Sequence, residues 1–295
     1  MSDRASISNI VKLSIPIFFA NLVIPLVAIV DTGLMGNLDN ASYLTATSIA
    51  TSVFSLIFWS FGFLRMGTVG LVAQAHGSNQ YEQIVNLVFQ NIAFVIIISL
   101  LLVIFQKYIF TIALSIFDLS NETSKYFKEY FQIRIYSSFG ELIIFIITGL
   151  FIGLQRTTIS SVVVGFFSIT NILLSLIFVI SFDLDVRGVA LGTVISSTLT
   201  AIIFLSYTFF ELKKFTSIKI NIAKIFNLKK IKKLFNINLD IFIRSALLTF
   251  SFIFFTYLGN TISEDVVAAN TILLNLIMLS AFILDAYAFS TEGIV

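Results

Sequence analysis

The sequence predicts an all-α, polytopic membrane protein, and two observations, its composition and its long apolar runs, support this fold class. Hydrophobic residues make up 58% of the 295 residues, and charged residues make up only 12%. Several apolar runs exceed the roughly 20 residues that an α-helix needs to cross a bilayer core. The chain contains no cysteine, which excludes disulfides, thiol nucleophiles and iron–sulfur sites.

The apolar runs predict eight membrane-spanning helices. They cover residues 14–36, 44–73, 84–108, 130–153, 159–181, 188–210, 239–259 and 266–290. The first run is long enough to span and contains an acidic residue and prolines, so we expect an integral helix in place of a cleavable signal peptide.

A lysine-rich segment follows the sixth run. Residues 211–236 hold eight lysines and one acidic residue, which predicts a cytoplasmic location because Lys and Arg mark cytoplasmic loops. The segment is either an amphipathic helix on the inner leaflet or a solvated linker. Counting back six helices also places the amino terminus in the cytoplasm. The predicted location is the inner (plasma) membrane, which the chain crosses several times.

A weak internal repeat suggests two related units. Shifting the chain by 223 positions matches Gly36 and Asn37 with Gly259 and Asn260, and Gly70 with Gly293. Both units begin on the same side, as in transporters built from parallel repeats. We therefore predict an amino-terminal six-helix lobe at 1–210, a basic linker at 211–238 and the first two helices of a carboxyl-terminal lobe at 239–295, as in a truncated twelve-helix transporter.

Asp31 is the only formally charged group in the first apolar run, and Pro25 precedes it by six residues. A carboxylate in hydrocarbon costs roughly 2.5–3.5 kcal/mol on insertion scales, so it is retained chiefly beside a cavity, a partner or an ion path. Pro25 removes a backbone hydrogen bond and predicts a bend in the helix. The alternative is a structural Asp31 that caps a helix or hydrogen-bonds a neighbouring helix.

Six stretches of the sequence resemble the multidrug and toxic compound extrusion (MATE) family, specifically its DNA-damage-inducible protein F branch. They are DTGLMG at 31–36, FWSFGFLRMGTVGLVAQAHG at 58–77, GLFIGLQRTTIS at 149–160, DIFIRS at 240–245, and VVAANTILLN at 266–275 with LDAYAFSTEGIV at 284–295. The resemblance implies a secondary antiporter that exports organic, often cationic, compounds against inward flow of protons or sodium ions.

The resemblance also implies site residues. Asp31 matches the family's cation-coupling aspartate, and Asn171 matches a neighbouring asparagine in the fifth helix. Ser175 stands where many relatives carry a second carboxylate, which favours proton coupling or a sodium site completed elsewhere. Asn171 and Ser175 share one helical face, and hydrogen bonding to a neighbouring helix is the alternative role for both.

Other polar residues at membrane depth have less specific predictions. Glu141 is expected to pair with Arg134 or Arg65, and Arg65 is predicted to be structural or to act in gating. In the eighth run, Asp285 and Glu292 lie seven residues apart and point the same way. Together with Tyr287 and Met278 they are candidates for the substrate cleft. The spacings 149–153 and 188–192 are GxxxG motifs, which favour close helix packing.

Several functions are excluded or less favoured. The sequence has no GxxxxGK[ST] phosphate loop, and its single histidine, His76, has no cysteine or paired carboxylate near it. We therefore expect no enzyme, no cofactor, no nucleic-acid partner and no metal site other than sodium at Asp31. The expected partners are small organic substrates and the lipid bilayer, with a monomeric protein. A lipid-linked oligosaccharide flippase of similar architecture and an inactive fragment are the alternatives.

Overall fold

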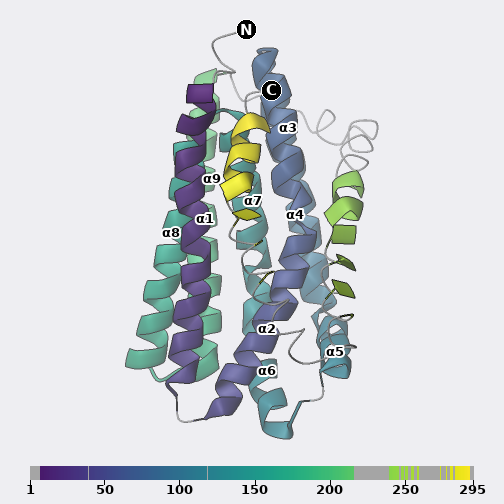
Figure 1. The fold of residues 1–295 in the computed structure, drawn as a ribbon, viewed down its shortest axis with the longest axis vertical. Helices are drawn as coiled ribbons and strands as arrows, with labels where there is room; N and C mark the ends of the chain where they lie inside the picture. Colours follow the sequence, from purple (N-terminus) through teal and green to yellow (C-terminus); the bar gives the residue numbers. More distant parts are fainter. Residues whose placement is uncertain are drawn as a thin grey trace.

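The computed structural model describes residues 7–38, 40–117, 119–215, 239–245 and 283–292, together with positions 247, 248, 250, 251, 254, 255, 258, 273, 277, 280 and 281. Up to residue 215 the elements are helices in the order shown in Figure 1. They are α1 (Ile7–Gly36), α2 (Ala41–Ser60), α3 (Phe63–Gly77), α4 (Tyr81–Ile104), α5 (Gln106–Ile116), α6 (Asn121–Arg134), the 3₁₀-helix η1 (Ile135–Ser137), α7 (Ser138–Gly153), α8 (Thr157–Leu176), the π-helix η2 (Ile177–Ser181) and α9 (Asp185–Phe215).

Six helical stretches in the described part of the chain are long and apolar enough to cross a membrane. They are Ile10–Gly36, Ala41–Gly77, Tyr81–Ile104, Asn121–Gly153, Thr157–Ser181 and Asp185–Lys214. The all-α membrane fold and the first six predicted spans are thereby confirmed. The predicted seventh and eighth spans, and the division into lobes and linker, lie largely outside the described residues and stay predictions.

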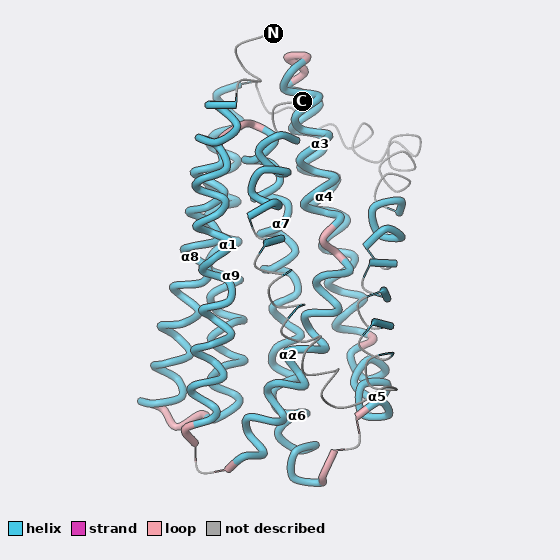
Figure 2. The backbone as a smooth tube through the Cα atoms, in the orientation of Figure 1, coloured by secondary structure: helices cyan, strands magenta, loops and turns pink. Residues whose placement is uncertain are grey.

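The second stretch is broken in its middle, where the sequence predicted one helix over 44–73. The bonds from Phe61 N to Phe58 O and from Gly62 N to Trp59 O, at 2.9 and 3.0 Å, are of the tighter i→i+3 kind. A methyl group at Gly62 would lie 3.1 Å from the Trp59 carbonyl oxygen, so the tight turn favours glycine. The tube in Figure 2 shows α2 and α3 meeting at this break.

The span boundaries differ from prediction at two other places. The third membrane stretch, α4, ends at Ile104, and Gln106 begins the separate helix α5. The predicted end of this span at 108 was therefore wrong. The fourth stretch begins at Asn121 and passes through η1 before α7, earlier than the predicted start at 130. Apolar runs did not predict α6 because its sequence is rich in polar and charged residues.

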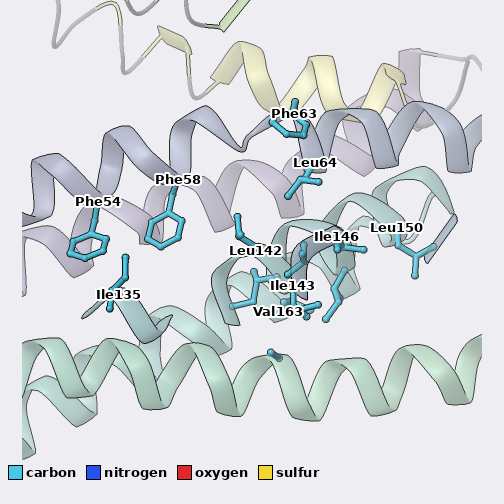
Figure 3. Packing of buried hydrophobic residues seen from close by; sticks show 14 of the residues in the cluster. Phe54, Phe58, Phe63, Leu64, Ile135, Leu142, Ile143, Ile146, Leu150 and Val163 are labelled. Atoms are coloured by element: carbon cyan, nitrogen blue, oxygen red, sulfur yellow. The ribbon is translucent and has the colours of Figure 1, made fainter. Parts of the chain in front are cut away.

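The fourth stretch forms the centre of the bundle. Within the 18-residue apolar part of this stretch, 78% is buried inside the protein, the highest share among the six stretches. A helix that is apolar on all sides belongs inside a protein, and α7 is such a helix: Leu142, Ile143 and Ile146 are at most 1% exposed. Figure 3 shows these side chains within the buried apolar cluster that also contains Leu64 of α3 and Phe54 and Phe58 of α2.

Glycines allow α7 to approach α3 closely. A methyl group at Gly149 would lie 2.7 Å from the Arg65 carbonyl oxygen, and one at Gly153 would lie 2.8 Å from that of Val69. Both distances are shorter than any side chain tolerates. The prediction that the 149–153 GxxxG motif serves close helix packing is confirmed.

The helices α3 and α7 end in the same kind of turn. At the end of α7, the Arg156 N–H donates to the Phe151 carbonyl oxygen at 2.7 Å, and an equivalent bond closes the turn after α3. The turn residues Asn79 and Gln155 have φ angles of 56° and 59°. This left-handed conformation is normal for glycine and tolerated by asparagine, but it strains other side chains.

We expect the Gln155→Gly variant to be more stable than the parent protein by about 1 kcal/mol, because glycine removes the strain of the left-handed conformation. The measurement is the thermal unfolding midpoint of purified protein in detergent. Asn79→Gly is the matched control and should change the midpoint less. A lower midpoint for Gln155→Gly would contradict the assignment of strain.

Candidate functional site

The carboxylate of Asp31 lies near the end of α1. This helix runs without interruption through both Pro16 and Pro25 and ends at Gly36. The Asp31 residue is partly exposed, but its Oδ1 atom is buried and has no hydrogen-bond partner among the described residues. The predicted bending at Pro25 is untested by the single conformation seen here.

The fifth membrane stretch carries the two polar residues that were predicted to accompany Asp31. Asn171 and Ser175 of α8 are both 0% exposed and lie one helical turn apart. The Ser175 hydroxyl is within hydrogen-bonding reach of the Asp31 carboxylate, although neither Asp31 Oδ1 nor Ser175 Oγ completes a hydrogen bond of normal geometry. The structure therefore brings Asp31 and Ser175 together at the α1–α8 contact.

The neighbouring helix α9 holds Asn171 in place. The Asn171 Nδ2 group donates to Thr193 Oγ1 at 2.9 Å and reaches Ser196 Oγ at 3.4 Å. This leaves Asn171 Oδ1 buried and, within the described part of the chain, without a donor. The predicted alternative, hydrogen bonding to a neighbouring helix, thus applies to the amide nitrogen of Asn171 and leaves its oxygen available.

Sequence reasoning missed Thr193 and Ser196. The available signal was the run of small polar residues GTVISSTLT at 192–200. Close approach of α8 and α9 brings these hydroxyls to Asn171: a methyl group at Gly192 would lie 2.9 Å from the Ser175 nitrogen. The GxxxG motif ending at Gly192 therefore also serves packing, as predicted.

A largely buried ion pair acts on Asp31 from α6 and α7. Arg134, the last residue of α6, pairs with Glu141 in α7, and their side chains are 12% and 14% exposed. The Arg134 guanidinium carbon also lies 5.1 and 5.3 Å from the ring centroids of Phe54 and Phe58. Of the two predicted partners of Glu141, the structure selects Arg134 and not Arg65.

Arg134 and Tyr130 of α6 act electrostatically on Asp31. Tyr130 is 2% exposed and also interacts with Arg134. Two carboxylates and one guanidinium thus share this region, and their charges sum to minus one when both acids are ionised. One bound monovalent cation or one proton would neutralise the group.

The predicted substrate residues lie elsewhere, at the end of the described chain. Asp285 and Glu292 both act electrostatically on Arg65 of α3. Tyr287 is 42% exposed. Met278 lies outside the described residues, and the role of all four in substrate contact stays a prediction.

The described residues contain no group of three or more His, Cys, Asp or Glu side chains arranged to hold a metal ion. The three unpartnered oxygens of the predicted coupling residues belong to one carboxylate, one amide and one hydroxyl. One charged carboxylate oxygen with neutral amide and hydroxyl oxygens is a donor set that hard cations accept, so this set fits either a proton or a weakly held alkali cation.

A family comparison matches residues 16–177 of this chain to MatE. Among curated proteins, the chain is 30% identical over 255 residues to DNA damage-inducible protein F of Escherichia coli, covering 86% of this chain and 55% of that protein. It is 24% identical over 242 residues to the multidrug export protein MepA of Staphylococcus aureus, covering 81% of this chain and 52% of that protein. The chain spans about half the length of these relatives.

Solved structures share the fold. A superfamily transporter from Pyrococcus furiosus, described as having a binding pocket of reverse polarity, superposes with a TM-score of 0.85 at 20% identity, covering 97% of this chain and 63% of that one. MATE transporter structures described as straight and bent superpose with TM-scores of 0.84 and 0.85, also at 20% identity, covering 97% of this chain and 64% of theirs.

Proposed function

This chain belongs to the MatE family of membrane transport proteins, and we propose that it carries the cation-coupling site of a secondary antiporter. The proposed antiporter exports organic, often cationic, compounds in exchange for protons or sodium ions by alternating access. The relatives include a multidrug export protein, which supports this substrate class.

One observation carries the proposal: three buried oxygens on two helices lack hydrogen-bond donors in the described part of the chain. They are Asp31 Oδ1, Asn171 Oδ1 and Ser175 Oγ. Buried polar atoms of folded proteins are nearly always satisfied, and a buried orphan oxygen is stabilised by a proton or a cation. The orphaned atoms coincide with the three residues that the sequence proposes for cation coupling.

The proposed mechanism links charge at Asp31 to the shape of α1. Proton or cation uptake from the outer side neutralises the carboxylate, which removes the cost of an anion in low dielectric. The helix then bends at Pro25, where one backbone hydrogen bond is missing, and substrate is expelled outward. Release of the proton or cation to the cytoplasm resets the site. The straight and bent structures of a related transporter support a bending step.

The proposed setting is the inner (plasma) membrane, with the amino terminus in the cytoplasm. This orientation rests on the lysines of residues 211–236 and on the positive-inside rule. The proposed domain division is a six-helix lobe, a basic linker and the start of a second lobe.

The test is efflux of a fluorescent organic cation from vesicles that contain the purified protein. A proton gradient and a sodium gradient are imposed in turn. Efflux driven by either gradient supports antiport and identifies the coupling ion. If correctly inserted protein shows no efflux under both gradients, the antiporter proposal is wrong for this chain, and the flippase and inactive-fragment alternatives gain weight.

For the bending step, we expect the Pro25→Ala variant to slow gradient-driven efflux severalfold, because alanine restores the missing helical hydrogen bond and stiffens α1. Pro16→Ala is the matched control in the same helix. Efflux that stays normal in Pro25→Ala and falls in Pro16→Ala would move the hinge to Pro16. Normal efflux in both variants would contradict bending at a proline.

A further inference from the structure

The helical segment 283–292 packs against the first six-helix unit far from Asp31. Its residues Ala286 and Phe289 are 1% and 6% exposed and form a small apolar cluster with Ile17 of α1, Val69 of α3 and Ile152 of α7. In Figure 1 this segment, drawn in yellow, lies beside α3 and α7 at the end of the bundle where α1 begins. Segments more than 130 positions apart in the sequence therefore meet here.

Arg65 lies at the centre of this contact. Its guanidinium carbon is 3.9 Å from the centroid of the Phe289 ring, the distance of a close cation–π contact. The Arg65 Nε atom is buried and has no hydrogen-bond partner among the described residues. The guanidinium is thus held mainly by the ring and by the surrounding charges.

Two acidic residues share a helical face with Phe289. Asp285, Phe289 and Glu292 follow the spacing i, i+4, i+7, which places them on one face of a helix. Both acids act on Arg65, and Arg244 also acts on Glu292. With two acids and two arginines the contact is balanced in charge, and moving Arg65 away would leave one negative charge beside an aromatic ring.

We propose that Asp285, Phe289 and Glu292 form a recognition face for a planar monovalent organic cation. In the structure, the guanidinium group of Arg65 occupies this face. A guanidinium is itself a flat, delocalised cation that stacks on aromatic rings and binds carboxylates. A guanidine, an amidine or a flat aromatic cation fits the same surroundings. Because one ring face holds one cation, such a compound binds by displacing Arg65, which separates segment 283–292 from α3.

This inference deepens the proposed function by naming a substrate class and a second site, and its transport step rests on that function. Its test measures binding to purified protein without any ion gradient. Failure of this site is therefore distinguishable from failure of antiport, which is tested by gradient-driven efflux.

The first experiment is chemical rescue of the Arg65→Ala variant. Methylguanidinium chloride should raise the thermal unfolding midpoint of Arg65→Ala by several degrees more than sodium chloride of equal ionic strength, and it should leave the parent protein unchanged. The control is Arg187→Ala, which removes an arginine that pairs with Glu129 on the protein surface. No selective rise in Arg65→Ala, or an equal rise in Arg187→Ala, would overturn the proposal.

The second experiment uses ethidium, a flat fluorescent cation, and the Arg65→Met variant, which keeps the apolar length of the side chain. We expect ethidium to bind Arg65→Met about tenfold more tightly than the parent, since a displaced cation–π contact is worth about that factor. Adding Asp285→Asn and Glu292→Gln should abolish the gain. Unchanged affinity in Arg65→Met, or a gain that survives loss of both acids, would contradict the recognition face.

Discussion

The Asp31→Asn variant is expected to insert and fold normally but to lose ion-coupled efflux completely. Asparagine has nearly the same shape as aspartate, and its amide group can donate to the Ser175 hydroxyl that faces Asp31. The packing of α1 against α8 should therefore survive. What the variant lacks is a group that ionises, so no proton or cation can be exchanged at this position.

The measurement is efflux of an organic cation from vesicles under whichever gradient drives the parent protein, with surface yield and thermal midpoint recorded for each variant. Thr32→Val is the matched control, because Thr32 is the next residue of α1 and its side chain is exposed. Thr32→Val should transport like the parent. Gradient-driven efflux retained by Asp31→Asn would exclude Asp31 as the coupling group.

The Gly140→Ala variant is expected to be strongly destabilised. A methyl group at Gly140 of α7 would lie 2.6 Å from the Ser197 carbonyl carbon and 2.8 Å from its oxygen, both in the backbone of α9. Backbone atoms in a packed helix cannot move aside without shifting the helix. Overpacking of this kind costs about 1–3 kcal/mol, and Gly140 lies in the centre of the bundle.

The measurement is the fraction of detergent-solubilised protein that stays monodisperse after heating. Gly165→Ala is the matched control: Gly165 lies within α8, and a methyl group there would have no atom within 4 Å. Alanine favours a helix over glycine by about 0.8–1.0 kcal/mol, so Gly165→Ala should be neutral or stabilising. Equal stability of the two variants would contradict the close approach of α7 and α9.

Much of the candidate site was accessible from the sequence because charge in an apolar run is conspicuous. Asp31 needed only its neighbours in the chain to be recognised. Asn171 and Ser175 required the family resemblance, since buried amides and hydroxyls are common in membrane helices. Thr193 and Ser196 were not predicted, because neither their residue type nor their spacing distinguishes a site residue from one that only packs between helices.

Partners across helices could not be predicted from spacing. Glu141 had two candidate partners, Arg134 and Arg65, and both arginines can form the same kind of ion pair with a carboxylate. The 3₁₀ turn at Ile135–Ser137 brings Arg134 toward Glu141, whereas Arg65 stacks on Phe289. Such choices depend on the relative rotation of packed helices, which a single sequence does not encode locally.

The sequence by itself determined the all-α membrane fold, the six spans of the first unit and the location of a carboxylate at Asp31, because hydropathy and buried charge act on each segment separately. Only the tertiary structure decided that the second span breaks at Phe61 and Gly62, that Ser175 of α8 faces Asp31 of α1, and that Arg65 lies on Phe289. These features depend on distances between segments remote in the chain, which packing sets and composition does not.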